Sequence, residues 1–200
     1  FPATTDLLPD IEGRRVLDAG CGSGAYTEWL VDRGAEVIGV DVSEPMLDRA
    51  RDRVADRAEF HRADLAEPLE FAREDAFDGV VSALALDYVE DWRAPFGAFA
   101  RLLAPDGFLV FTVPHPFNEY PLEEDENYFE VERRVKEWSV DIPYFRRPLG
   151  EMLGPLLETG FRLDAITEPR PTDRFRERWP ERYETESKRP VFLCVRAVRP

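Results

Sequence analysis

The sequence predicts an α/β fold in which a doubly wound parallel sheet carries helices on both faces. Short apolar runs of strand length recur from residue 16 to residue 113, and segments with apolar residues at helical spacing separate them. This alternation is typical of βαβ units, whose crossover helices cover both sides of the sheet. Because 200 residues fit one domain, we expect a single domain over residues 1–200.

Five strands and three helices are expected in the first part of the chain. The strands are expected at 16–17, 36–40, 59–62, 79–82 and 108–113, and the helices at 26–33, 46–55 and 96–103. Gly34 lies where glycine commonly ends a helix. Helical spacing returns at 149–157, and two final strands are expected at 161–166 and 191–198. The charged residues 174–186 between these strands are expected to form a solvated loop.

The alternating pattern stops between Val113 and Leu149. Residues 114–148 are rich in proline, aromatic and acidic residues, and 129–140 mix apolar and charged residues as a surface strand or hairpin does. We therefore expect a cap or lid insertion over the carboxyl edge of the sheet. Five aromatic residues suit it to excluding water: Tyr128, Phe129, Trp138, Tyr144 and Phe145.

The composition is strongly acidic. Asp and Glu number 41 against 26 Lys and Arg, which gives a net charge of −15, and Lys136 and Lys188 are the two lysines. Such a surface repels the phosphates of nucleic acids and anionic membranes, so neither is expected as a partner. An acid-rich, lysine-poor composition is typical of halophilic microbes, although an ordinary acidic protein is the alternative.

Cellular location is suggested by what the printed sequence lacks. It contains no apolar stretch of about 18 residues and no signal segment, so we expect a cytoplasmic protein that is a monomer or homodimer. Cys21 and Cys194 are expected to be free thiols. The sequence starts at Phe1-Pro2 rather than methionine, which leaves open a preceding segment that contributes to the ligand pocket.

A loop with glycine at every second position follows the first expected strand. Gly20, Gly22 and Gly24 allow the backbone to bend sharply and to touch a ligand, because they lack Cβ atoms. Asp41 lies 21 residues after Gly20, at the end of the second strand, where a carboxylate can accept hydrogen bonds from both ribose hydroxyls. The pattern predicts a ligand with an adenosine-like ribose, which includes NAD.

Three other residues favour a cationic adenosine ligand. The Asp18 carboxylate would lie close to the pyrophosphate of a dinucleotide, and it suits a ligand with an ammonium and a sulfonium better. Asp64 follows the third strand and could accept a hydrogen bond from the adenine amino group, or could serve only in a turn. Met46 offers an apolar surface for the adenine face, with packing in the core as the alternative.

Together these segments resemble the class I S-adenosylmethionine-dependent methyltransferases. The resemblance covers residues 16–113 and rests on the segments 16–24, 41–47, 63–65, 77–86 and 102–107. It implies a Rossmann-like sheet of seven strands, with the antiparallel last strand, 191–198, between strands five and six. It also implies S-adenosyl-L-methionine as the cofactor and transfer of its methyl group to a small-molecule acceptor.

The resemblance implies a set of cofactor contacts at the carboxyl ends of the strands, with residues 82–84 near the methyl group. The predicted cofactor-binding residues are Asp18, Gly20, Cys21, Gly22, Gly24, Asp41, Val42, Met46, Asp64, Leu65, Ser82 and Leu84.

A second set is expected around the acceptor. His115 follows the fifth strand, where open α/β sheets bind their ligands, and is the candidate catalytic base or acceptor contact; a structural role is the alternative. Asp87, Tyr88 and Trp92 follow the fourth strand and are expected to line the acceptor pocket, or else to pack the start of a helix. Arg146 completes the predicted acceptor residues. No cluster of His and Cys has metal-ligand spacing, so no metal is expected.

Two alternative functions stay open on the sequence. An NAD-dependent oxidoreductase uses a similar glycine turn, but no evident catalytic Tyr-x-x-x-Lys pair accompanies it here. A non-catalytic module that binds an adenosyl ligand is the other alternative, since a fold does not guarantee an activity.

Overall fold

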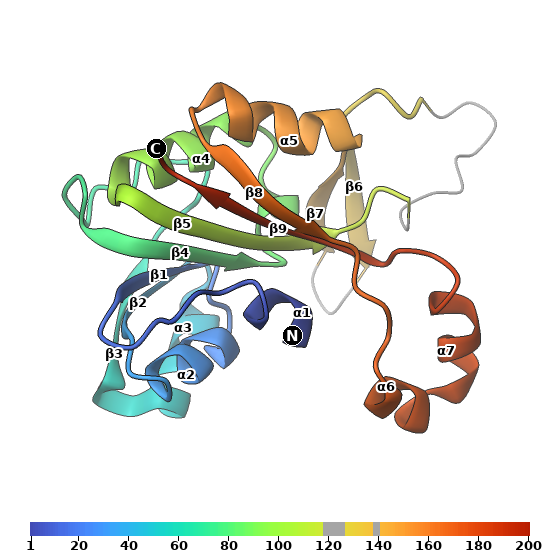
Figure 1. Cartoon of the computed structure of the whole chain (residues 1–200), viewed down its shortest axis with the longest axis horizontal. Coiled ribbons are helices and arrows are strands. Elements are labelled where there is room, and N and C mark those ends of the chain that lie inside the picture. Colours follow the sequence, from blue (N-terminus) through green and yellow to red (C-terminus); the bar gives the residue numbers. More distant parts are fainter. Residues whose placement is uncertain (118–126, 138–140) are drawn as a thin grey trace.

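A seven-stranded sheet in the order β3-β2-β1-β4-β5-β9-β8 runs through the protein (Figure 1). The computed structural model describes residues 1–117, 127–137 and 141–200. The strands of this sheet are β1 Arg15–Ala19, β2 Glu36–Asp41, β3 Ala58–Arg62, β4 Phe77–Ala83, β5 Leu103–Pro114, β8 Arg162–Thr167 and β9 Phe192–Val198. β9 is antiparallel to both of its neighbours, and the other pairs are parallel. The predicted seven-stranded, mostly parallel sheet is confirmed, with its last strand in the predicted place.

Helices cover both faces of the sheet, as the doubly wound prediction requires. Figure 1 shows α1 (Pro2–Thr5), α2 (Ala25–Val31) and α3 (Glu44–Val54) on one side, and α4 (Arg93–Leu102) and α5 (Leu149–Glu158) on the other. Two short 3-10 helices, η1 (Ala55–Arg57) and η2 (Leu86–Tyr88), follow α3 and β4. The four helices predicted before residue 160 are therefore present.

The central strands are apolar on both faces because each face packs against helices. Val80 and Leu109 belong to a core cluster that includes Phe96 of α4, whereas their neighbours Val81 and Val110 belong to a second cluster on the α2 side. All five side chains are fully buried. Side chains alternate between the faces of a strand, so a continuous apolar run fills both cores.

The predicted insertion contains a hairpin. β6 (Glu132–Glu137) pairs antiparallel with β7 (Asp141–Arg146), and β7 contacts η2 at the carboxyl end of β4. The hairpin confirms the predicted surface strands. The predicted lid as a whole, 114–148, includes residues outside the described ranges, among them Trp138.

The solvated loop predicted for 174–186 is wrong, because this stretch forms two helices. α6 (Asp173–Arg178) begins after Thr172, whose hydroxyl accepts a hydrogen bond from the Phe175 N–H at 3.2 Å, and α7 (Pro180–Glu186) begins with a proline. The guanidinium of Arg182 lies over the Phe175 ring, 5.4 Å from its centre. N-terminal capping and arginine–aromatic stacking support helices whose charged composition suggested a loop.

The described residues also bear on membrane-spanning helices and on the two cysteines. None of the described helices is long and apolar enough to cross a membrane. Cys21 and Cys194 are both buried and free, as expected.

Candidate active site

The glycine loop joins β1 to α2 at the carboxyl edge of the sheet. Gly20 has a φ of +78°, and a Cβ atom there would lie 2.1 Å from the Ala85 Cβ, so only glycine fits. The amides of Gly20 and Cys21 both donate to the carbonyl oxygen of Val40, at 2.8 and 2.9 Å. Gly22 also has a positive φ, of +53°, but a Cβ atom there would meet nothing within 4 Å. The loop is thus tied to the sheet at one end and leaves open space at Gly22.

Asp41, the last residue of β2, faces this loop. One of its carboxylate oxygens accepts a hydrogen bond from the Gly22 N–H at 2.9 Å, and the other accepts one from the Ser43 N–H, also at 2.9 Å. Each carboxylate oxygen has two acceptor positions, so both oxygens retain one for a ligand. Asp41 can therefore hold the loop and accept hydrogen bonds from ribose hydroxyls together.

Asp18 lies beneath the loop rather than at its surface. Its side chain is 1% exposed and accepts a hydrogen bond from the Thr27 hydroxyl at 2.6 Å, near the N-terminus of α2. Burial raises the pKa of Asp18 to about 6, and the hydrogen bonds from Thr27 oppose that rise. The structure therefore places Asp18 beneath the glycine loop, which it can shape, and its predicted contact with the cofactor stays a prediction.

Apolar side chains are exposed beside Asp41 and at the end of β4. Val42 is 56% exposed, Met46 37% and Leu84 45%, so Met46 does not pack in the core. Leu84 has a φ of +56°, which is uncommon for a leucine and marks a constrained backbone at this edge. Exposed apolar side chains around a polar anchor are typical of a binding groove.

The predicted adenine contacts lie after β3. Leu65 is buried, whereas the Asp64 side chain is exposed and one of its oxygens accepts a hydrogen bond from the Ala66 N–H at 2.9 Å. Asp64 thus forms a turn, as in the alternative interpretation, and its second carboxylate oxygen can still accept from a ligand. The hydroxyl of Ser82 is fully buried and has no hydrogen-bond partner among the described residues.

Three of the four predicted acceptor residues line one small cavity. Asp87, Trp92 and Arg146 meet there beside the end of β5, and Tyr88 does not line it. Arg146 is 3% exposed and pairs with Glu132 at 2.6 Å. Trp92 is 1% exposed and packs edge-on against core aromatic rings, so its geometry favours the packing alternative.

Sequence reasoning missed Arg147, which lines the same cavity. Its guanidinium lies 4.4 Å from the centre of the Trp92 ring and donates to the carbonyl oxygen of Val89 at 2.6 Å. Burial lowers the pKa of Arg147 to about 10, partly offset by nearby carboxylates such as Glu151. Nothing in the sequence around Arg146 and Arg147 distinguishes these two adjacent arginines, so Arg147 could not be predicted to line the cavity.

His115 links the end of β5 to the segment after β8. Its Nδ1 accepts a hydrogen bond from the Phe117 N–H at 3.0 Å, and its Nε2 lies 2.8 Å from a carboxylate oxygen of Glu168. Burial lowers the pKa of His115, although Glu168 opposes that change. Because both ring nitrogens already have partners, the geometry favours a positioning role over that of a base.

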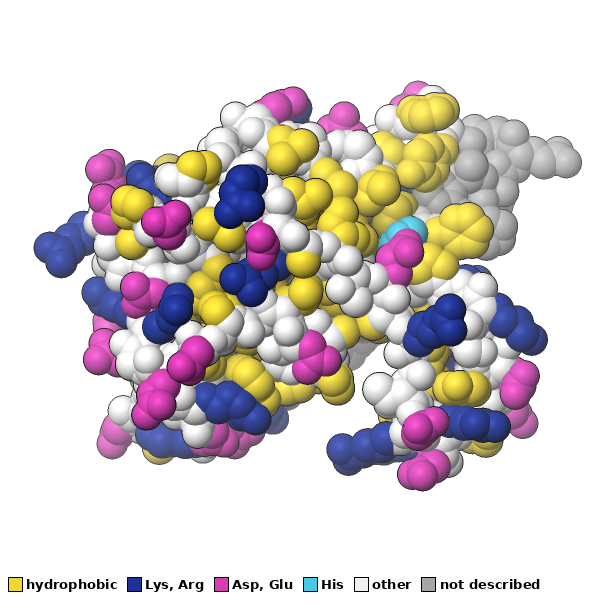
Figure 2. All heavy atoms as spheres, in the orientation of Figure 1, with side chains coloured by type: hydrophobic (Ala, Val, Ile, Leu, Met, Phe, Trp, Pro, Cys, Tyr) yellow, Lys and Arg dark blue, Asp and Glu magenta, His cyan; other side chains and the backbone are white. Residues whose placement is uncertain are grey.

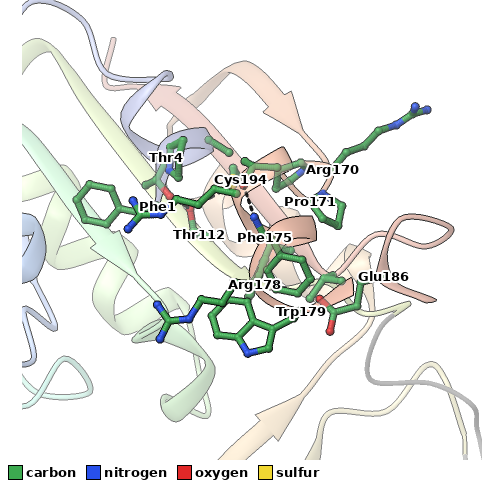
Figure 3. A pocket seen from close by; sticks show the side chains of 17 residues that line it. Phe1, Thr4, Thr112, Arg170, Pro171, Phe175, Arg178, Trp179, Glu186 and Cys194 are labelled. Carbon is green, nitrogen blue, oxygen red and sulfur yellow. Dashed lines mark hydrogen bonds between the residues drawn. The ribbon is translucent and has the colours of Figure 1, made fainter. Parts of the chain in front are cut away.

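A larger cavity lies on the α1 side of the sheet, between α1, β5, β9 and α6 (Figure 3). It encloses about 390 Å³. Its lining includes Thr4, Thr112, Cys194, Phe175 and Trp179. This cavity could not be predicted from the sequence, because the segments that form it are far apart in the chain. The spacing of Phe175 and Trp179, four residues apart after a capping threonine, was the available signal.

Known proteins decide the family. A family model described as a methyltransferase domain matches residues 17–111. The crystal structure of an S-adenosylmethionine-dependent methyltransferase from Mesorhizobium loti is 31% identical, with a TM-score of 0.81 over 99% of this chain and 96% of its own. The chain belongs to the S-adenosylmethionine-dependent methyltransferases. Its cofactor is therefore S-adenosyl-L-methionine, and the oxidoreductase alternative is set aside.

Curated relatives of this methyltransferase match it either over nearly the whole chain or over about half of it. An uncharacterized protein of Haemophilus influenzae is 27% identical over 98% of this chain and 85% of its own. The ubiquinone biosynthesis O-methyltransferase of Alkalilimnicola ehrlichii is 37% identical over 52% of this chain. The chain matches only 43% of the length of that second relative.

The residues at the glycine loop of the methyltransferase fit its cofactor. The open space at Gly22, the spare acceptor positions of Asp41 and the exposed Val42 and Met46 suit an adenosine carrying an amino-acid arm. Cys21 is buried, and burial raises the pKa of its thiol well above the ordinary value. Cys21 is thus a buried residue of the loop whose thiol stays protonated, and its predicted contact with the cofactor stays a prediction.

Proposed function

We propose that this methyltransferase methylates an oxygen atom of a small-molecule acceptor. The relative from Alkalilimnicola ehrlichii, which is 37% identical over 52% of this chain, is named as an O-methyltransferase. The net charge of −15 supports a small molecule over nucleic acid.

The cofactor site in this proposal is the carboxyl edge of β1, β2 and β4. Asp41 accepts hydrogen bonds from the ribose hydroxyls, while Val42, directly after β2, and Met46 in the first turn of α3 contact the adenine. The backbone of the glycine loop lies against the amino-acid arm. Asp64, Leu65, Ser82 and Leu84 remain proposed contacts from the neighbouring strand ends.

When bound, S-adenosyl-L-methionine supplies a methyl group on a positively charged sulfur, which is already electrophilic. The protein then has chiefly to hold the acceptor oxygen in line with that group and to exclude water. The backbone at the end of β4 links the cofactor edge to β5. The Leu84 N–H donates a hydrogen bond to the Thr112 carbonyl oxygen of β5 at 2.7 Å.

One observation carries the cofactor part of the proposal: Asp41, the open backbone at Gly22 and three exposed apolar side chains all lie at the carboxyl edge of the sheet. Calorimetric titration with S-adenosylhomocysteine tests it, with NADH as the comparison ligand. We expect one molecule of S-adenosylhomocysteine to bind per chain and NADH to give no saturable heat. Binding of NADH alone would overturn the proposal.

The catalytic part of the proposal needs a second measurement. Incubation with methyl-labelled S-adenosylmethionine and a panel of phenols and carboxylic acids is expected to label at least one acceptor on oxygen. Tight cofactor binding without transfer to any of them, also in 1 M KCl, would support the non-catalytic alternative.

A further inference from the structure

The cavity beside α1 lies over β5, the strand next to the proposed cofactor edge at β4. The Thr112 side chain lines its floor, and the Thr112 carbonyl accepts the hydrogen bond from Leu84 at the end of β4. The hydroxyls of Thr4 and Thr112 lie 2.9 Å apart, and the Tyr26 hydroxyl donates to Thr4 at 3.0 Å. Tyr26 follows the last glycine of the loop by two residues, so hydrogen bonds through Thr4 link the cavity floor on β5 to the start of α2.

Aromatic side chains form the apolar walls. Phe1 is 52% exposed, Trp179 41% and Phe192 37%, and all three line the cavity together with Phe175. Figure 3 shows Phe175 of α6 and Trp179, the residue after this helix, across the cavity from Phe1, Thr4 and Thr112 of the body of the protein. A volume of about 390 Å³ lies in the range of small-molecule sites. The walls therefore suit a flat, apolar ring.

Two arginines lie on the cavity side of α6. Arg174 and Arg178 are one helical turn apart and both line the cavity, whereas Arg176 does not. The Arg178 guanidinium stacks on the Trp179 ring, 4.7 Å from its centre, which leaves its N–H edges available to a carboxylate. In Figure 3 Arg178 extends to the side on which Phe1 lies, while Arg170 points away.

These two arginines have no acidic partner within ion-pair distance among the residues that the structure describes. Asp and Glu outnumber Lys and Arg in this chain, yet no carboxylate of the described residues pairs with either arginine, so both can pair with an anionic ligand. The acidic lining residue, Glu186, already pairs with Arg182 at 2.7 Å. The cavity therefore offers cationic groups to a ligand.

We infer that this cavity binds the methyl acceptor and that the acceptor is an aromatic molecule carrying a carboxylate. The ring lies between the aromatic walls, and the carboxylate pairs with Arg174 and Arg178, which match its planar geometry. The inference rests on the proposed function for the cavity's role, and a carboxylate is the planar anion whose geometry the two guanidinium groups match.

Titration with 3,4-dihydroxybenzoate, its neutral methyl ester and phenyl phosphate tests this inference, each with and without S-adenosylhomocysteine. We expect the carboxylate to bind at least tenfold more tightly than the ester. Changing both Arg174→Gln and Arg178→Gln should remove that preference and leave the affinity for S-adenosylhomocysteine unchanged. Arg176→Gln, on the other side of the same helix, is the matched control and should behave as the wild type.

Several results would overturn the inference. These are equal affinity for acid and ester, no binding of 3,4-dihydroxybenzoate, tighter binding of phenyl phosphate, or an equal loss in the Arg176→Gln control. Failure of the proposed function looks different, because 3,4-dihydroxybenzoate would then still bind more tightly than its ester, while no methyl group was transferred to oxygen. Circular dichroism of each variant verifies that α6 is retained.

Discussion

The carboxylate of Asp41 has two tasks at once, since it holds the glycine loop and faces the proposed ribose position. Replacing it with alanine removes charge-assisted hydrogen bonds to the ligand and loosens the Gly22 backbone. We expect Asp41→Ala to weaken S-adenosylhomocysteine binding by about 2 to 3 kcal/mol, measured by calorimetry. Unchanged affinity in a folded variant would mean that the ribose is held elsewhere.

Asp18 gives the folded protein a specific pH dependence. Burial raises the pKa of its carboxyl from the ordinary 3.8 to about 6. The folded state therefore binds this proton more tightly than the unfolded state does. The contribution of Asp18 to stability therefore decreases as pH rises from about 4 to 6, by about 3 kcal/mol in all.

Asp18→Asn tests this directly, because the amide cannot ionise and its oxygen can still accept the Thr27 hydrogen bond. Denaturant unfolding between pH 4 and 7 should show the variant gaining stability relative to the wild type as pH rises. Parallel stability curves over that range would show that Asp18 keeps an ordinary pKa.

At the scale of elements, few contacts hold α6 and α7 against the rest of the protein. The structure shows no buried residue in either helix, and they contact each other. Figure 2 shows this helix pair as a lobe that projects beyond the body of the molecule. Glu168 lies on the segment that leads from β8 to α6, and it pairs with His115 at the end of β5. This pair can therefore position the α6 wall of the larger cavity.

We expect His115→Ala to speed tryptic cleavage within residues 170–178 several-fold while the melting temperature changes little. The reason is that the substitution removes the contact with Glu168 without opening a large core cavity. His115→Gln, which keeps a polar group near Glu168, should partly restore the protection. Unchanged cleavage together with a hundredfold loss of turnover would instead assign His115 a direct catalytic role.

Strands, helices and the glycine loop could be predicted where residues close together in the sequence determine them. Gly20 and Asp41 could be located because a strand, a glycine turn and a second strand follow one another in sequence. The cavity could not, because Thr4, Thr112 and Phe175 meet only through tertiary packing. The helices α6 and α7 were missed since their charges outweighed the weaker signals of Thr172 and Pro180.

At the scale of the whole molecule, the charge of −15 makes repulsion between carboxylates a general cost of folding. Screening shortens the range of that repulsion from about 10 Å at 0.1 M salt to about 3 Å at 1 M. We expect the melting temperature to rise steadily with KCl over this range. A flat or falling curve in calorimetry would contradict the expectation of a halophile-like surface.

The molecule as a whole combines a sheet edge that fits S-adenosyl-L-methionine with a separate aromatic cavity one strand away. A crystal structure with S-adenosylhomocysteine bound tests this arrangement most directly. The ligand is predicted to lie across the carboxyl ends of β1, β2 and β4, with its ribose at Asp41 and its amino-acid arm along the Gly20–Gly24 loop. The ligand lying elsewhere, or that groove remaining empty at saturating concentration, would contradict the account.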